Sequence, residues 1–187
     1  LKGLQTEYHI YGPKHVPDRG MWETDGLIRY EEISAVEEIV TDRQSDFSPK
    51  EVIYPVSQTI FKFDENNCVE TVTKDPKGII IFMRPCDING LKRLDNMFLA
   101  NGGISDVYYK RMRDKVKIFM MECERSWDNC YCVSMGTNKT ENYSVACCLH
   151  EEEIYLEVKD AEFIDYFEDE MESGYKPLFI EENQRKV

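Results

Sequence analysis

The sequence lacks most of the patterns that identify common catalytic and binding sites. Histidine is scarce, with three among 187 residues. No stretch matches the G-x-G-x-x-G or P-loop patterns, so a glycine-rich phosphate-binding loop is not expected. No apolar run is long enough to span a bilayer, and no secretory signal pattern is present. We therefore expect a cytoplasmic protein that does not span a membrane.

Positive charge is also in short supply. The chain has 23 Lys and Arg residues against 36 Asp and Glu residues, which gives a formal net charge of −13. Such a charge argues against nucleic acid or an anionic membrane as a partner. It fits a solvated acidic protein, or one that docks on a basic protein face. The length suggests one domain with a real core, so we expect residues 1–187 to form a single α/β domain.

The centre of the chain predicts a strand, a helix and a second strand. Residues 79–83 form a short apolar run rich in β-branched side chains, and Val116–Met121 form another. Between them, Asp87 can cap a helix whose apolar residues recur at helical spacing from residue 88 to residue 98. This is a βαβ unit, whose two strands should be parallel.

Antiparallel hairpins are expected on both sides of this unit. Residues 58–63 and 69–73 predict one hairpin, and residues 143–149 and 153–158 predict another. An acidic amphipathic helix should follow at residues 161–172, and much of the negative charge should gather there. The predicted fold is α/β, a mixed sheet with a central βαβ unit plus antiparallel hairpins.

The remaining segments give weaker patterns. Residues 1–19 contain two X-Pro turns and predict extended segments and turns, and residues 26–30 predict a short strand. Residues 31–42 allow a strand or a helix, and we favour a strand that enters a turn. Residues 106–113 predict a short basic helical turn, and residues 177–182 a last strand or the start of a linker.

Four of the seven cysteines form the strongest candidate site. Cys86 follows the first strand of the βαβ unit and Cys123 follows the second, while Cys130 and Cys132 lie in a nearby polar loop. The carboxyl ends of neighbouring parallel strands meet at one edge of a sheet, where α/β proteins keep their binding crevice. Thiolates are soft ligands for zinc, copper(I) or iron–sulfur clusters. These residues therefore predict a metal site.

Two other interpretations of the cysteines stay open. Free cysteines are often buried as small apolar residues, and we assign Cys68, Cys147 and Cys148 to the core on this ground. Alternatively, Cys86 at a helix N-terminus beside Arg84 could have a depressed pKa and act as a nucleophile. No histidine lies near that segment in the sequence to act as its base, which makes a thiol enzyme the minor alternative.

Several motifs together resemble a known family. They are the segments at residues 84–95 (RPCDINGLKRLD), 108–111 (YYKR) and 130–137 (CYCVSMGT), with Cys123 between the last two. In these segments the chain resembles the family of iron–sulfur subunits of anaerobic sulfite reductase, and the related sulfhydrogenase beta subunits share the pattern. With Tyr11-Gly12-Pro13 upstream, the resemblance covers most of the 187 residues.

The resemblance implies an electron-transfer role. The partners would be a flavin-containing subunit that takes electrons from NADH and a sirohaem-containing subunit that reduces sulfite to sulfide. This chain would belong to an oxidoreductase complex without itself reducing sulfite. The alternatives are the beta subunit of a sulfhydrogenase-type complex, or a structural docking domain with buried thiols and no metal.

The resemblance also bears on the extent of the chain and on its cofactor. Members of the family carry two four-iron clusters on Cys-x2-Cys-x2-Cys runs in a C-terminal ferredoxin-like region, and this sequence has no such run. We therefore expect the N-terminal part of a longer subunit. The ligands of a further 4Fe-4S cluster would be Cys86, Cys123, Cys130 and Cys132, with zinc or no metal as the alternatives.

Overall fold

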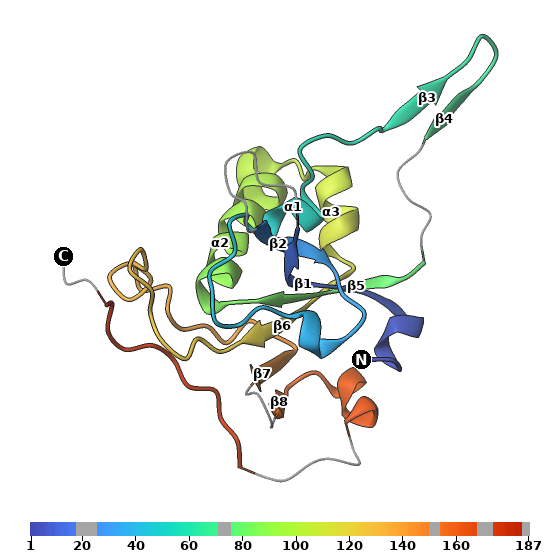
Figure 1. Ribbon diagram of the computed structural model, residues 1–187. Coiled ribbons are helices and arrows are strands. Elements are labelled where there is room, and N and C mark those ends of the chain that lie inside the picture. Colours follow the sequence, from blue (N-terminus) through green and yellow to red (C-terminus); the bar gives the residue numbers. More distant parts are fainter. Residues whose placement is uncertain (18–25, 71–75, 150–153, 168–173, 185–187) are drawn as a thin grey trace.

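The computed structural model describes residues 1–17, 26–70, 76–149, 154–167 and 174–184, and it confirms the mixed α/β class (Figure 1). Its main sheet has the strand order β2-β1-β5-β6-β7-β8. The four inner strands are parallel to one another, whereas the edge strands β2 and β8 pair antiparallel. The strands are β1 (Tyr8–Val16), β2 (Leu27–Glu32), β5 (Gly78–Met83), β6 (Val116–Met121), β7 (Val145–Leu149) and β8 (Ile154–Val158).

The two central strands confirm the predicted βαβ unit. β5 and β6 pair in parallel, with Ile79 opposite Val116 and Met83 opposite Met120. Both faces of this pair are buried, because Ile80 belongs to the core on one side of the sheet and Ile81 to the core on the other. Such two-sided burial explains why these strands read as continuous apolar runs.

Helices cover one face of the sheet. They are α1 (Lys50–Ile53), α2 (Pro85–Asp95) and α3 (Val107–Arg113), which bury Ile53, Leu91 and Tyr109 in the same core cluster. The opposite face is covered by short 3-10 turns, among them η1 (Leu4–Thr6) and η5 (Ala161–Tyr166). In the part of the chain that the structure describes, no helix is long and apolar enough to cross a membrane.

The ends of α2 differ from the sequence prediction. The helix begins at Pro85, so Asp87 lies in its first turn and does not cap it; Arg84 holds the cap position without a side-chain hydrogen bond. After Asp95 the helix widens into a π-turn, η3 (Asn96–Ala100), and a 3-10 turn, η4 (Asn101–Gly103). In η4, Gly102 has a φ of 75°, a conformation that favours glycine and stops the helix.

The first predicted hairpin projects away from the rest of the molecule (Figure 1). It consists of β3 (Phe61–Phe63) and β4 (Cys68–Glu70), which pair only with each other. All six residues are exposed. The assignment of Cys68 to the core was therefore wrong, because no second layer packs on this hairpin.

The N-terminal segment is more regular than predicted. A nine-residue strand, β1, occupies the position where extended segments and turns were expected. It tolerates Pro13 because β5 pairs only with residues 8–11, so beyond Tyr11 the strand has a single neighbour, β2. The strand favoured within residues 31–42 covers only its first two residues, since β2 ends at Glu32, and the expected turn follows as a short 3-10 turn, η2 (Val36–Glu38).

The C-terminal third is partly as predicted. β7 and β8 form the expected antiparallel hairpin, and the turn between them lies outside the described residues. Instead of the predicted amphipathic α-helix there is the 3-10 helix η5, in which Phe163 is buried and Glu162 pairs with Lys117 at 2.7 Å. Residues 168–173, where the rest of the acidic cluster falls, are outside the described residues. Residues 177–182 form no strand.

Candidate metal centre

Two of the four predicted site cysteines follow neighbouring strands. Cys86 is the second residue of α2, directly after β5, and Cys123 comes two residues after the end of β6. Because β5 and β6 are adjacent and parallel, both thiols lie at the carboxyl edge of the sheet. This placement agrees with the strand geometry expected from the sequence.

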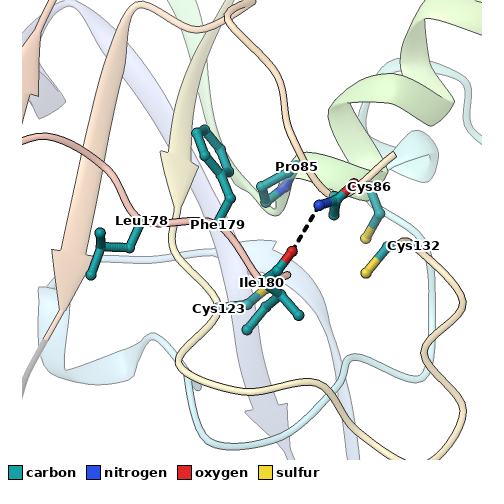
Figure 2. A pocket seen from close by; sticks show the side chains of 8 residues that line it. Pro85, Cys86, Cys123, Cys132, Leu178, Phe179 and Ile180 are labelled. Atoms are coloured by element: carbon teal, nitrogen blue, oxygen red, sulfur yellow. Dashed lines mark hydrogen bonds between the residues drawn. The ribbon is translucent and has the colours of Figure 1, made fainter. Parts of the chain in front are cut away.

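A small cavity at this edge brings three of the cysteines together (Figure 2). Its volume is about 20 Å³, which is room for roughly one water molecule. In Figure 2 the sulfur atoms of Cys86 and Cys132 point toward one another. The lining residues are Pro85, Cys86, Cys123, Cys132, Asn138, Leu178, Phe179 and Ile180.

The loop that carries Cys132 is built from consecutive tight turns. The backbone N–H of Cys130 donates to the carbonyl of Trp127 at 2.9 Å, and that of Thr137 donates to the carbonyl of Cys132 at 2.8 Å. Gly136 has a φ of 63°, which lets the chain turn back after the second cysteine. These local bonds place Cys130 and Cys132 without any helix or strand.

Cys130 is placed differently from the other three. It does not line the cavity, and its Sγ accepts hydrogen bonds from the backbone N–H of Trp127 at 3.2 Å and from Nε2 of Gln44 at 3.3 Å. It is still within electrostatic reach, because negative charge on Cys130 raises the pKa values of Cys123 and Cys132. The structure thus brings three predicted ligands around one cavity and places the fourth beside it.

Desolvation by surrounding atoms is the largest cause of the pKa shifts of Cys86 and Cys123, although Cys86 is exposed and Cys123 is partly exposed. It raises the pKa of Cys86 to about 12 and that of Cys123 to about 11, and neighbouring thiols add to both shifts. The nearby Arg84 opposes the shifts without overcoming them. The direction of the Cys86 shift argues against a low-pKa nucleophile, even though the residue is exposed, because desolvation by the surrounding atoms outweighs the attraction of Arg84.

The C-terminal segment closes the cavity, a role that the sequence analysis missed. Asn138 donates from Nδ2 to the carbonyl of Ile180 at 2.7 Å, the bond drawn in Figure 2. Asn183 donates from Nδ2 to Oγ of Ser134 at 2.7 Å and also accepts from the backbone N–H of Val133 at 3.3 Å. No local pattern could have revealed these contacts, because they join segments about 40 to 50 residues apart.

The donor set suits a soft metal or an iron–sulfur cluster. Sulfur atoms are the only strong metal ligands among the residues lining the cavity. As the side chains stand, no group of three or more His, Cys, Asp or Glu residues in the described part of the chain is arranged to hold a metal ion. The cavity therefore offers thiol donors that suit a soft metal, but these side chains are not arranged as a metal site.

Comparison with known proteins gives one informative similarity. The chain is 32% identical over 131 residues to sulfhydrogenase 2 subunit beta of Pyrococcus furiosus. The match covers 69% of this chain and 35% of that protein, so the chain spans about a third of the length of this relative. No family model and no solved structure matches the chain. The chain is thus similar to a sulfhydrogenase beta subunit, which supports the related group of redox subunits, and the finer resemblance to the iron–sulfur subunit of sulfite reductase is not confirmed.

Proposed function

We propose that this chain is the N-terminal domain of an electron-transfer subunit in a cytoplasmic redox complex, and that it binds a 4Fe-4S cluster. The observation that carries the proposal is the meeting of Cys86, Cys123 and Cys132 around one cavity at the carboxyl edge of the sheet. Cys130, whose charge is coupled to two of them, would be the fourth ligand. The similarity to a sulfhydrogenase subunit supports a redox role.

In such a site the cluster would carry the electron, and the residues of this domain would hold the cluster. A bound cluster supplies a one-electron redox couple to a chain of centres. The residues of this domain hold the sulfur atoms and limit the access of water, since Pro85, Phe179 and Ile180 form apolar walls of the cavity. Because the pKa values of Cys86 and Cys123 lie well above neutral pH, loading must release protons from these thiols.

The complex itself is proposed at two levels of detail. The similarity to sulfhydrogenase 2 subunit beta favours a sulfhydrogenase-type beta subunit. The motifs around Cys86 and Cys132 also support the iron–sulfur subunit of an anaerobic sulfite reductase, with flavin-containing and sirohaem-containing partner subunits. Anaerobic affinity purification of the chain from its own cells should recover a flavin-containing subunit in both cases. Recovery of a sirohaem-containing subunit would favour the sulfite reductase.

Zinc is a second candidate because of the size of the cavity. Its volume of about 20 Å³ is closer to a single ion than to a four-iron cluster. Zinc takes four thiolates in a tetrahedral arrangement, and such a site would be structural. The chain would then be a docking domain with no redox centre of its own.

Anaerobic reconstitution with iron and sulfide distinguishes these candidates. The domain should take up about four irons and gain a broad visible absorption that dithionite bleaches. Cys132→Ala should abolish both, because it removes a lining sulfur. The matched control is Cys148→Ala, which removes a thiol buried within β7 and should load as the wild type does. Stoichiometric zinc without uptake of iron would overturn the cluster and leave a structural site.

A further inference from the structure

The C-terminal segment at residues 174–184, which we call the strap, is fastened at one end beside an inner thiol of the cavity. Glu122 is the residue directly before Cys123, and its carboxylate accepts a hydrogen bond from the phenol of Tyr175 at 2.5 Å. The same carboxylate oxygen also accepts from the backbone N–H of Leu178. A single side chain at the end of β6 therefore holds this end of the strap.

The other end of the strap is bound to the loop that carries Cys132. Asn183 accepts from the backbone N–H of Val133, the residue directly after Cys132, at 3.3 Å. Nearby, Lys139 pairs with Glu181 at 2.6 Å, but their side chains are 54% and 72% exposed. An ion pair so exposed contributes little to stability. The strap thus joins the two chain segments on either side of the cavity through a few polar contacts.

Little besides these contacts holds the strap in place. Residues 174–184 form no helix or strand, so their backbone lacks the regular hydrogen bonds of the sheet. Phe179 packs against the core, whereas the neighbouring Leu178 is 73% exposed. Segments with few apolar contacts and exposed hydrogen bonds are those that open locally while the rest of a protein stays folded. By contrast, the opposite walls of the cavity stand on the ends of two central strands.

The strap also limits what can enter the cavity. Leu178, Phe179 and Ile180 are three of the lining residues, and the enclosed volume of about 20 Å³ is room for roughly one water molecule (Figure 2). Among the lining thiols Cys86 is exposed, but Cys123 is only partly exposed. A species larger than water that has to contact the sulfur of Cys123 therefore needs more room than the closed cavity offers.

We propose that the strap opens as one unit while the sheet stays folded, and that its hydrogen bonds to Glu122 control the access of metal ions and other thiol-reactive species to Cys123. This inference goes beyond the proposed electron-transfer role. It concerns how the cavity is reached, and it is the same whether a cluster, a zinc ion or no metal occupies the cavity.

Thiol labelling of the reduced, metal-free chain tests the strap. The chain is treated with iodoacetamide at a fixed pH, and peptide mass spectrometry gives the reaction rate of each cysteine. Tyr175→Phe keeps the ring and removes the bond to Glu122, so Cys123 should react about tenfold faster. The matched control is Tyr143→Phe, which removes a phenol that donates to Glu157 at 2.6 Å outside the strap, and it should leave the rate at Cys123 unchanged.

Two other cysteines of the same chain show whether the opening is local. Cys68 is exposed on β4 and reports the reactivity of an open thiol, whereas Cys147 is buried within β7 and reports unfolding of the sheet. Both rates should be equal in the wild type and in Tyr175→Phe. A rise at Cys147 that matches the rise at Cys123 would mean that the whole domain unfolds, and it would overturn the strap as a separate unit.

A variant at the far end tests whether the strap moves as one unit. Asn183→Ala removes contacts to Ser134 and Val133 and touches neither Glu122 nor Cys123, yet it should accelerate labelling of Cys123 by about fivefold. An effect in Tyr175→Phe alone would show that the two ends open separately, and no effect in either variant would show that the strap does not control access. Both results overturn the inference and leave the proposed cluster standing, since no metal is used.

Discussion

Two groups of cysteines in this chain have opposite surroundings. Cys147 and Cys148 lie within β7, where both are buried, and the Sγ of Cys147 donates to the carbonyl of Met120 on the neighbouring strand at 3.2 Å. The other group lies beyond the strand ends, in a helix turn and a loop: Cys86, Cys123, Cys130 and Cys132. Backbone position thus decides whether a thiol is packed inside the sheet or lies at its carboxyl edge beside the cavity.

Removing the bound group should produce the largest difference between the two cysteine groups. A ligand present at 100 times its dissociation constant stabilises the folded state by about 2.7 kcal/mol, which raises the melting temperature of a chain this long by at least about 5 °C. Differential scanning calorimetry should show this gap between loaded and metal-free wild type, and also for Cys148→Ala. The gap should vanish in Cys123→Ala. An equal rise in melting temperature on loading in Cys148→Ala and Cys123→Ala would contradict the distinction between the two cysteine groups.

A smaller effect is expected on the stability of the metal-free protein. Cys147→Ala leaves a void in a site where 1% of the residue is exposed, and it should lower the free energy of unfolding by about 1 kcal/mol. Cys132→Ala acts in a partly exposed loop and should change it by less than about 0.5 kcal/mol. Urea unfolding in the presence of a reductant measures both. A larger loss of stability in Cys132→Ala than in Cys147→Ala would contradict this expectation and show that the loop thiol contributes more to packing.

The smallest expected effect is on the pH dependence of stability. Burial raises the pKa of Cys147, so the folded state keeps its proton while the unfolded chain loses it above the ordinary value of 9.0. Above pH 9.0 the unfolded state therefore binds fewer protons than the folded state, and the free energy of unfolding falls as the pH rises. Below pH 9.0 the protonated thiol makes its full contribution to stability. Cys147→Ala should make this fall less steep above pH 9.0.

The control for this measurement removes packing without removing a proton. Val145→Ala changes a fully buried residue on the same strand and has no titratable group. It should lower stability by a similar amount at every pH, which leaves the slope unchanged. Urea unfolding at a series of pH values measures how steeply the free energy of unfolding falls with pH. If this slope is the same in Cys147→Ala as in the wild type, the Cys147 thiol does not contribute to the pH dependence of stability.

Part of the site could be predicted because it follows from local sequence. The apolar runs of β5 and β6 mark the strands, and the parallel pairing of strands joined by a helix then places Cys86 and Cys123 at one edge. We expected Cys132 to lie near Cys86, but this required the loop that carries Cys132 to fold back toward the strand ends. Its tight turns, which include Gly136 with a positive φ, show how that happens.

Other parts could not be predicted from local patterns. Cys68 and Cys147 both lie in short strands, yet one is exposed and the other buried. The difference arises because β4 has one neighbour and no covering layer, whereas β7 has strands on both sides. Gln44 is also distant from Cys130 in the sequence, and its hydrogen bond to that thiol depends on the loop at residues 41–44 packing beside Trp127.

By itself, the sequence determined the central strands, the helix between them, the hairpin partners and the thiol chemistry of the site, because these depend on periodicity, turn residues and side-chain type. Only the tertiary structure decided that β1 forms a strand through Pro13, that the atoms around Cys86 raise the pKa of its thiol, and that residues 178–180 line the cavity. Each of these depends on which distant segments exclude water from a given atom, and that information is absent from any local stretch of sequence.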